Sequence, residues 1–285
     1  MRKVSVIADT TSDLSPELLA KYQVTVFPLH IHLGDAEYSD GVDITPDEIY
    51  AWSDKNKATP KTSALSTVEA IEVLKKKLAE SEEVVCFCIS EQMSACANVM
   101  RMAAEELDAT DKVFVVDSRN LSTGIGLQVI EAAIMADKGM SAAQIVAEIE
   151  KIRPLVRASF VVDTLTYLHR GGRCSGVAAL AGSALRLHPY IGVVDGAKHP
   201  GKKYRGKMDR VIIDYVKDLE PELKKAKADR VFITHSGCTP EILDTIKKEL
   251  ENLNYFGEIL TTRAGSVITS HCGPGTLGVL FIAGE

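Results

Sequence analysis

Short apolar runs alternate with amphipathic segments along the first half of the chain. Runs rich in Val and Ile occupy residues 3–9, 24–32, 84–89 and 113–117. Helical periodicity covers residues 16–22, 45–54, 66–81, 94–107, 123–138 and 141–153. Because strands that alternate with helices form parallel sheets, the pattern predicts an N-terminal parallel-sheet α/β domain over residues 1–156.

The pattern changes after Pro154. Strands are predicted over residues 157–163, 190–194, 230–235, 258–263 and 276–283, and helices over 207–226 and 240–252. A glycine-rich stretch at 171–173 and a hairpin-like stretch at 195–202 are predicted as loops. We therefore expect a second domain of α/β, α+β-like character over residues 157–285. No long linker separates the two domains, so we expect them to share a cleft.

Composition and charge place the chain among soluble globular proteins. Hydrophobic residues make up 46% and charged residues 25% of the chain, and the net charge of −6 gives no reason to expect nucleic acid as a partner. No apolar run approaches the ~18 residues that a membrane span needs. The first residues do not resemble a signal peptide, so we expect a cytoplasmic location.

The six cysteines show no metal-binding or disulfide pattern. None belongs to a CxxC pair and none is near a metal-spaced histidine. Cys86 and Cys88 fall in an apolar run that is typical of a buried parallel strand, where Cys acts as a small apolar residue. We therefore expect neither a metal nor a cofactor.

Four polar turns, at residues 8–13, 62–66, 90–95 and 268–275, are candidates for holding a carboxylate. Hydroxyls and the free amides of helix N-termini bind anions without a cationic side chain. In the second turn, Ser66 and Glu69 match a capping box, as Ser141 and Gln144 do before the helix predicted at 141–153. The capping box does not use the hydroxyls of Thr62 and Ser63. The turn is therefore either a helix cap alone or a helix cap with a ligand site beside it.

The third turn joins a buried strand to a helix. It therefore lies at the carboxyl end of a parallel strand, where α/β folds bind ligands. Ser94 offers a hydroxyl, and the amides of Ala95 and Cys96 add donors of the first helical turn. The turn has no glycine repeat, which argues against a dinucleotide or P-loop site.

His271 lies in the fourth turn, where two glycines and a proline predict a tight turn before the last strand. It either braces this turn, donates a hydrogen bond to a carboxylate, or acts as the base for a serine nucleophile. The chain has no G-x-S-x-G motif, which makes a hydrolase the weaker choice.

Basic residues gather in the second half of the chain. Arg173 lies between loop glycines, and a local patch contains Lys198, His199, Lys202, Lys203, Arg205 and Lys207. A solvated hairpin explains this patch, and an anionic partner or a phosphate would also use it.

These turns, in this order, resemble the DegV family of bacterial fatty-acid-binding proteins, which includes the acyl-carrying subunit of fatty-acid kinase. The resemblance spans nearly the whole chain. Its most specific parts are residues 9–14, Asp117-Ser118 with 124–127, 163–168 with Gly171-Gly172-Arg173, Arg205-Gly206 and 268–278. The chain departs from the family pattern at Leu65, where proline is usual, and at Ala95, where glycine is usual.

The resemblance implies two α/β domains that bury a long-chain fatty acid, with its carboxylate held near the mouth of the cleft. It assigns this carboxylate to Thr62, Ser63, Ser94, the turn at Ala95, and His271. It places Arg173 and Arg205 on a surface that faces a kinase or a phosphate. It further implies a non-catalytic carrier, whose partner is the catalytic subunit of a fatty-acid kinase.

Two other functions remain open at this stage. Ser63 or Ser94 with His271 would suit an acyl hydrolase or a phosphoryl-transfer enzyme. A regulatory or interaction module rests on the basic hairpin alone. Turnover of acyl esters favours the enzyme, and salt-sensitive binding of nucleic acid favours the module.

Overall fold

Four parallel strands form the first sheet of the computed structural model, which describes residues 3–171 and 187–284. The sheet contains, in spatial order, β2 (Thr25–Phe27), β1 (Val4–Asp9), β6 (Glu83–Cys88) and β7 (Val113–Asp117). The side chains of Cys86, Phe87 and Cys88 are fully buried. The predicted parallel sheet and the apolar role of the two cysteines in β6 are confirmed.

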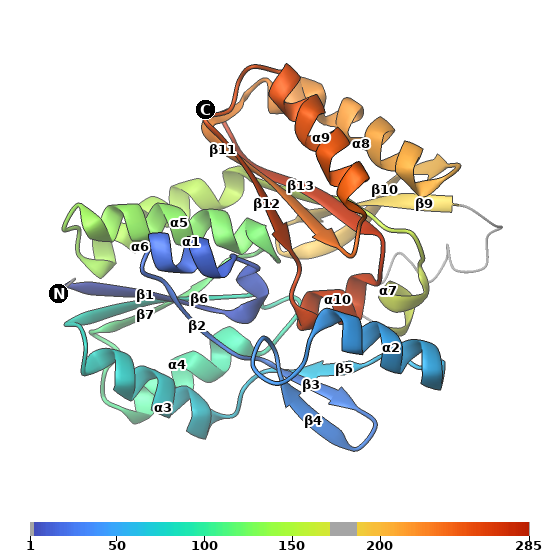
Figure 1. Ribbon diagram of the computed structural model, residues 1–285. Coiled ribbons are helices and arrows are strands. Elements are labelled where there is room, and N and C mark those ends of the chain that lie inside the picture. The colour runs from blue at the N-terminus through green and yellow to red at the C-terminus, as the bar shows by residue number, and fades with distance from the viewer. Residues whose placement is uncertain (1–2, 172–186, 285) are drawn as a thin grey trace.

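Helices cover both faces of this sheet (Figure 1). On one face lie α3 (Thr67–Leu78) and α4 (Cys96–Glu106), and on the other α1 (Pro16–Lys21), α5 (Thr123–Asp137) and α6 (Ala142–Ile152). Single 3₁₀ turns, η1 (Thr10–Ser12) and η2 (Arg153–Leu155), follow β1 and α6. The predicted capping boxes of Ser66 with Glu69 and of Ser141 with Gln144 both form.

The apolar run at residues 24–32 is two strands, so the prediction of one strand was wrong. β2 ends at Phe27, and β3 (His30–Leu33) belongs to a separate antiparallel sheet with β4 (Ala36–Ser39) and β5 (Lys61–Ser63). Pro28 lies between them and has no N–H to continue a hydrogen-bond ladder. Helix α2 (Pro46–Asn56) connects β4 to β5 and begins with a capping box at Thr45.

The second half forms a six-stranded mixed sheet. Its order is β10 (Ala197–Arg205), β9 (Leu187–Val194), β8 (Val156–Val161), β13 (Thr276–Ala283), β11 (Ala226–Ser236) and β12 (Glu258–Arg263). Only the pair β11 and β12 is parallel among the described strand pairs of this sheet. Helices α8 (Met208–Leu223) and α9 (Pro240–Asn252) cover its outer face (Figure 1). The predicted α+β-like character is confirmed.

Two predictions for this half were wrong in detail. Residues 195–202 are not a loop: Asp195 and Gly196, both at positive φ, form a tight turn between β9 and β10. The tight turn predicted before the last strand forms at 273–275, where both glycines have positive φ, but the residues ahead of it are a helix, α10 (Ser266–Cys272), and not part of the turn. A helix of two turns is too short for its periodicity to be recognised, as is α7 (Thr166–Gly171).

Helix α5 lies between the two large sheets. It packs against β1 on one side and against β8 and β13 on the other, and it is buried along most of its length. Glu131 of α5 forms ion pairs with Arg230 and Lys227 of β11. One hydrophobic core thus continues from the first sheet to the inner face of the second. The domain boundary after residue 156 falls at the start of β8 and stays a prediction.

Candidate functional site

A cavity of about 230 Å³ opens where α10, β5 and the turn before α4 meet. Its walls are mostly apolar, with hydroxyl, imidazole and ammonium groups among them. The lining residues are Leu29, Thr62, Ser63, Ala64, Ile89, Met93, Ser94, Ala95, Leu121, Lys198, Val267, Ile268, His271 and Cys272. The structure therefore brings together all five residues that the family resemblance assigned to a carboxylate.

Thr62 and His271, which both line this cavity, are hydrogen-bonded to each other. The Thr62 Oγ1 and His271 Nε2 atoms are 2.8 Å apart. Thr62 lies in the short strand β5, and His271 lies in the last turn of α10, with 9% of its surface exposed. These two groups, 209 residues apart in sequence, belong to the polar part of the lining of this mostly apolar cavity.

Ser63 has a different environment from Thr62. Successive side chains of a strand point to opposite faces, and the Ser63 hydroxyl lies 3.0 Å from Nε2 of His32 in β3. Ser63 is also exposed, whereas Thr62 is partly buried. It is therefore a less direct candidate than Thr62.

Ser94 and Ala95 occupy the start of α4. The Ser94 hydroxyl accepts a hydrogen bond of 3.3 Å from the Cys96 amide, and its own proton remains available to donate. Ala95 is the N-cap residue and forms no side-chain cap, because it has no polar side chain. Its φ of −81° is open to any L-residue, so the backbone tolerates alanine at this position, where the resemblance leads us to expect glycine.

Two buried aspartates fix the N-terminus of α10. Asp13 accepts a hydrogen bond from the Gly265 amide and Asp40 one from the Ser266 amide, both of 2.8 Å. Carboxylates at a helix N-terminus satisfy its free amides and its dipole. This double cap links α10 to the first half of the chain and so sets the position of His271. Asp13 belongs to the candidate turn at 8–13, but it caps α10 and is not among the described residues that line the cavity, and Asp40 belongs to none of the four candidate turns.

The Asp13 cap predicts a pH dependence of stability. Burial raises the pKa of Asp13 well above its usual range, although hydrogen bonds from Ser122 and Gly265 lower it. The unfolded chain releases this proton near pH 4, and the folded chain does so at higher pH. The contribution of Asp13 to the free energy of unfolding is therefore complete below about pH 4. It is lost as pH rises through the pKa of Asp13 in the folded protein.

Asp13→Asn removes this titration and keeps an oxygen acceptor for the Gly265 amide. We expect the free energy of unfolding to fall less between pH 5 and pH 8 in this variant than in the parent protein. Urea unfolding at both pH values measures the difference, and Asp111→Asn, at an exposed position, is the control. An equal or larger fall in Asp13→Asn would contradict the assignment.

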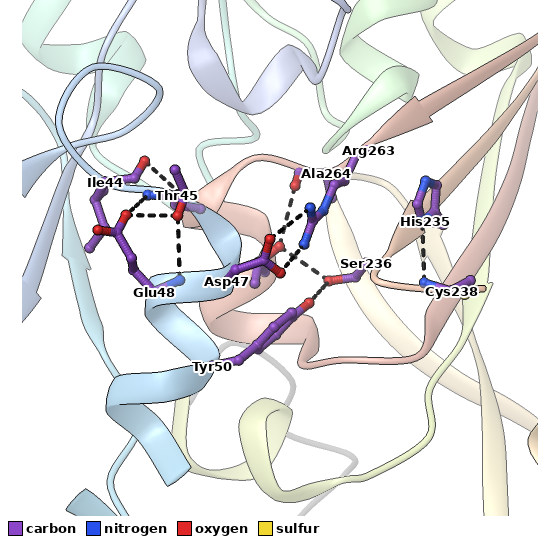
Figure 2. Close-up of polar contacts among 12 residues, drawn as sticks. Ile44, Thr45, Asp47, Glu48, Tyr50, His235, Ser236, Cys238, Arg263 and Ala264 are labelled. Carbon is purple, nitrogen blue, oxygen red and sulfur yellow. Dashed lines mark hydrogen bonds and ion pairs between the residues drawn. The ribbon is translucent and has the colours of Figure 1, made fainter. Parts of the chain in front are cut away.

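Hydrogen bonds and an ion pair hold helix α2 against the second half of the chain (Figure 2). The Tyr50 hydroxyl lies 2.6 Å from Ser236 Oγ, which lies 3.1 Å from Thr269 Oγ1 in α10. Asp47 forms a two-bond ion pair with Arg263. Because α2 leads into β5, these contacts also hold Thr62 near α10. They join residues far apart in sequence, and no local motif identifies them.

The basic residues divide into separate groups. Lys198 is only 8% exposed and lines the cavity, so its interpretation as part of a solvated hairpin was wrong. Arg205 is exposed at the end of β10 and is not among the lining residues. Arg173 lies outside the described residues, so its predicted role stays a prediction.

Asp9, Cys88 and Cys96 form the group of possible metal ligands within the described ranges, and their ligand atoms lie within 4.8 Å of one another. The Asp9 carboxylate already accepts hydrogen bonds from the Thr11 amide and hydroxyl and from the Ile89 amide. Burial raises the pKa of the Cys88 thiol well above its usual range, which favours the protonated form. The arrangement suits a packed, hydrogen-bonded cluster.

The two sheets and the apolar cavity with a hydroxyl-rich end define an α/β protein of the ligand-binding type. The chain belongs to the DegV family: the family model described as an uncharacterised protein of the DegV family matches residues 3–284. None of the helices within residues 3–171 and 187–284 combines the length and the apolar character of a membrane span.

Relatives and solved structures cover nearly the whole chain. A DegV domain-containing protein from Deinococcus radiodurans is 32% identical over 276 residues, which are 97% of each protein. A fatty-acid-binding DegV family protein from Thermus thermophilus is 31% identical, with a TM-score of 0.90 over 99% of this chain and 100% of that one. A stearic acid-binding protein from Eubacterium ventriosum is 29% identical, with a TM-score of 0.84 over 99% of this chain and 98% of that one.

Proposed function

We propose that this protein binds a long-chain fatty acid, with the carboxylate at Thr62, Ser94 and His271 and the acyl chain in the apolar interior. The observation that carries the proposal is the convergence of these three groups on one apolar cavity. An unpaired buried carboxylate costs several kcal/mol, and hydroxyl, imidazole and helix-terminal donors offset this cost. Structurally similar proteins that bind fatty acids support the proposal.

The acyl chain would continue from the cavity toward the second sheet. A smaller cavity of about 20 Å³ shares Leu121, Ile268 and Cys272 with the first and reaches Phe160 and Leu280. Ligand pockets usually measure roughly 300–1,000 Å³, so a long chain requires the shared side chains to move apart. Burial of a C16 chain supplies about 11 kcal/mol before the costs of association.

We further propose that the protein is a carrier rather than a hydrolase. The hydrogen bond of His271 Nε2 is made with Thr62, and that of the Ser63 hydroxyl with His32. His271 Nε2 is thus paired with a threonine, and not with the Ser63 or Ser94 hydroxyl that the hydrolase alternative would pair with it. Steady release of acid from a nitrophenyl acyl ester, lost in Ser94→Ala, would instead identify a hydrolase. The cytoplasmic location stays a prediction.

Ser94→Ala tests the head-group site. The variant removes one hydrogen bond to a charged group, so we expect the dissociation constant for palmitate to rise about tenfold. Competition with a fluorescent fatty acid measures it, after bound lipid has been removed. Thr110→Ala deletes an exposed hydroxyl outside the cavity and is expected to leave the constant unchanged. Equal affinities of Ser94→Ala and the parent protein would exclude this role of Ser94.

We also propose that the bound acid is presented to a separate fatty-acid kinase subunit, with Arg205 on the docking face. Support comes from the exposure of Arg205 on β10, the strand that carries Lys198 into the cavity. With ATP and such a subunit, we expect Arg205→Ala to lower acyl-phosphate formation about tenfold and to leave palmitate affinity unchanged. Hydroxylamine trapping measures the product, and Arg210→Ala is the exposed control. Unchanged formation would refute this docking role.

A further inference from the structure

A cavity of about 400 Å³ lies where the loop after β7, the segment between α6 and β8, and the β9–β10 hairpin meet. It shares no lining residue with the head-group cavity, which contains Thr62 and His271. Ligand pockets usually measure roughly 300–1,000 Å³. The cavity also lies at the carboxyl end of a parallel strand and between the two halves of the chain, where α/β proteins commonly bind ligands.

Three arginines, each from a different element, line this arginine cavity. Arg119 follows β7, Arg153 belongs to η2 and Arg157 belongs to β8. The acidic residues among the described lining residues are Glu150 and Asp195. Positive side chains thus outnumber negative ones here, although the whole chain carries a net charge of −6. This local excess favours an anion as the ligand.

Arg153 is already engaged by neighbouring groups. Its guanidinium forms two hydrogen bonds with the Glu150 carboxylate and a third, of 3.1 Å, with the carbonyl oxygen of Asp117 at the end of β7. The two-bond ion pair neutralises the charge of Glu150. Among the described lining residues, Asp195 therefore carries the remaining negative charge, against the two other arginines.

Hydrogen bonds fix the loop that carries Arg119. Oδ1 of Asp117 accepts one from the Arg119 amide at 2.9 Å and one from the Glu91 amide at 3.2 Å. Arg119 has a φ of +49°, a left-handed conformation that few residues other than glycine adopt. Such conformations are frequent at binding sites, where the surrounding contacts maintain them.

Arg119 and Arg157 have donors left for a ligand. Arg157 donates one side-chain hydrogen bond, of 2.8 Å, to the carbonyl oxygen of Pro154, and no described residue forms an ion pair with either arginine. A guanidinium carries five N–H donors in a planar fork, which matches the oxygens of a phosphate group. Val193 and Val194 line the same cavity, and Val194 is 56% exposed. An organic group next to the phosphate would gain from covering this apolar surface.

We propose that the arginine cavity is a second binding site, for a small organic molecule that carries a phosphate group. Arg119 and Arg157 bind the phosphate, and the valine side chains contact the organic part. The proposal does not depend on fatty-acid binding, because it rests on a different cavity and on different residues.

The test titrates phenyl phosphate into the purified protein, with phenol as the uncharged analogue. We expect the parent protein to bind phenyl phosphate with a dissociation constant on the order of 1 mM, and phenol at least about tenfold more weakly. The double variant Arg119→Gln, Arg157→Gln removes both guanidiniums at exposed positions. It is expected to weaken the binding of phenyl phosphate at least about tenfold. Ligand-observed NMR measures these weak constants.

Two control variants locate the ligand. Arg210→Gln, Lys217→Gln removes the same charge from exposed positions of α8 and should leave the affinity for phenyl phosphate unchanged. Thr62→Val, His271→Ala alters the head-group cavity and should also leave it unchanged. Circular dichroism checks the fold of each variant, and Arg119→Gln alone repeats the test if the double variant does not fold.

Three results would overturn the proposal. The first is an affinity of the folded Arg119→Gln, Arg157→Gln variant within about twofold of the parent value. The second is a parent protein that does not bind phenyl phosphate up to about 20 mM. The third is a loss of binding in Thr62→Val, His271→Ala alone, which would place the anion in the head-group cavity. None of these results bears on palmitate affinity, so fatty-acid binding is tested separately.

Discussion

The double variant Thr62→Val, His271→Ala is expected to lose palmitate affinity by at least about 100-fold. Each substitution removes a donor that faces the proposed carboxylate, and a hydrogen bond to a charged group contributes about 1.5–3 kcal/mol. The two side chains are hydrogen-bonded to each other at 2.8 Å. Removing both partners leaves neither member of this pair unsatisfied, so the fold should lose little stability.

Isothermal titration with delipidated protein measures this loss, and chemical unfolding checks the fold. The control is Thr110→Val, His199→Ala, in which the same residue types are replaced at exposed positions outside the cavity. A double variant that binds palmitate within about twofold of the parent protein would place the carboxylate elsewhere.

Gly273→Ala is expected to lower the free energy of unfolding by on the order of 3 kcal/mol. Gly273 ends α10 directly after Cys272, with φ of +75° and ψ of 174°, a conformation that is essentially confined to glycine. A Cβ at this position would lie 2.5 Å from Cδ2 of Tyr167 in α7. The substitution therefore combines backbone strain with a steric clash next to the site.

Gly34→Ala separates these two contributions. Gly34 has φ of +67°, and no atom lies within 4 Å of its hypothetical Cβ. We expect this control to lose only about 1 kcal/mol, from backbone strain alone. Urea unfolding of both variants measures the difference. Equal losses would show that neither the ψ of 174° at Gly273 nor its contact with Tyr167 adds to the loss.

The sequence predicted the parts of this fold that local patterns determine. The helices α3 and α6 begin at the capping boxes that Ser66 and Ser141 predict, and β6 is the buried parallel strand that its apolar run indicates. Each of these features depends on residues within a few positions of one another. The resemblance of the ordered turns to one family added the grouping of Thr62, Ser94 and His271.

The parts that were missed depend on contacts between distant residues. Helix α10 is short, and its start is determined by Asp13 and Asp40, more than 220 residues earlier in the chain. Lys198 was grouped with its exposed neighbours, because its burial depends on how the hairpin packs against the rest of the chain. Such tertiary contacts leave no periodic or local signal in the sequence.

Native mass spectrometry of the purified protein, followed by extraction of any released lipid, tests the central claim most directly. The account predicts a one-to-one adduct on the 30.9 kDa chain whose released component is a long-chain fatty acid. The adduct should be depleted in the Thr62→Val, His271→Ala variant. A chain mass without adduct, unchanged after incubation with C14 to C18 fatty acids, would contradict it.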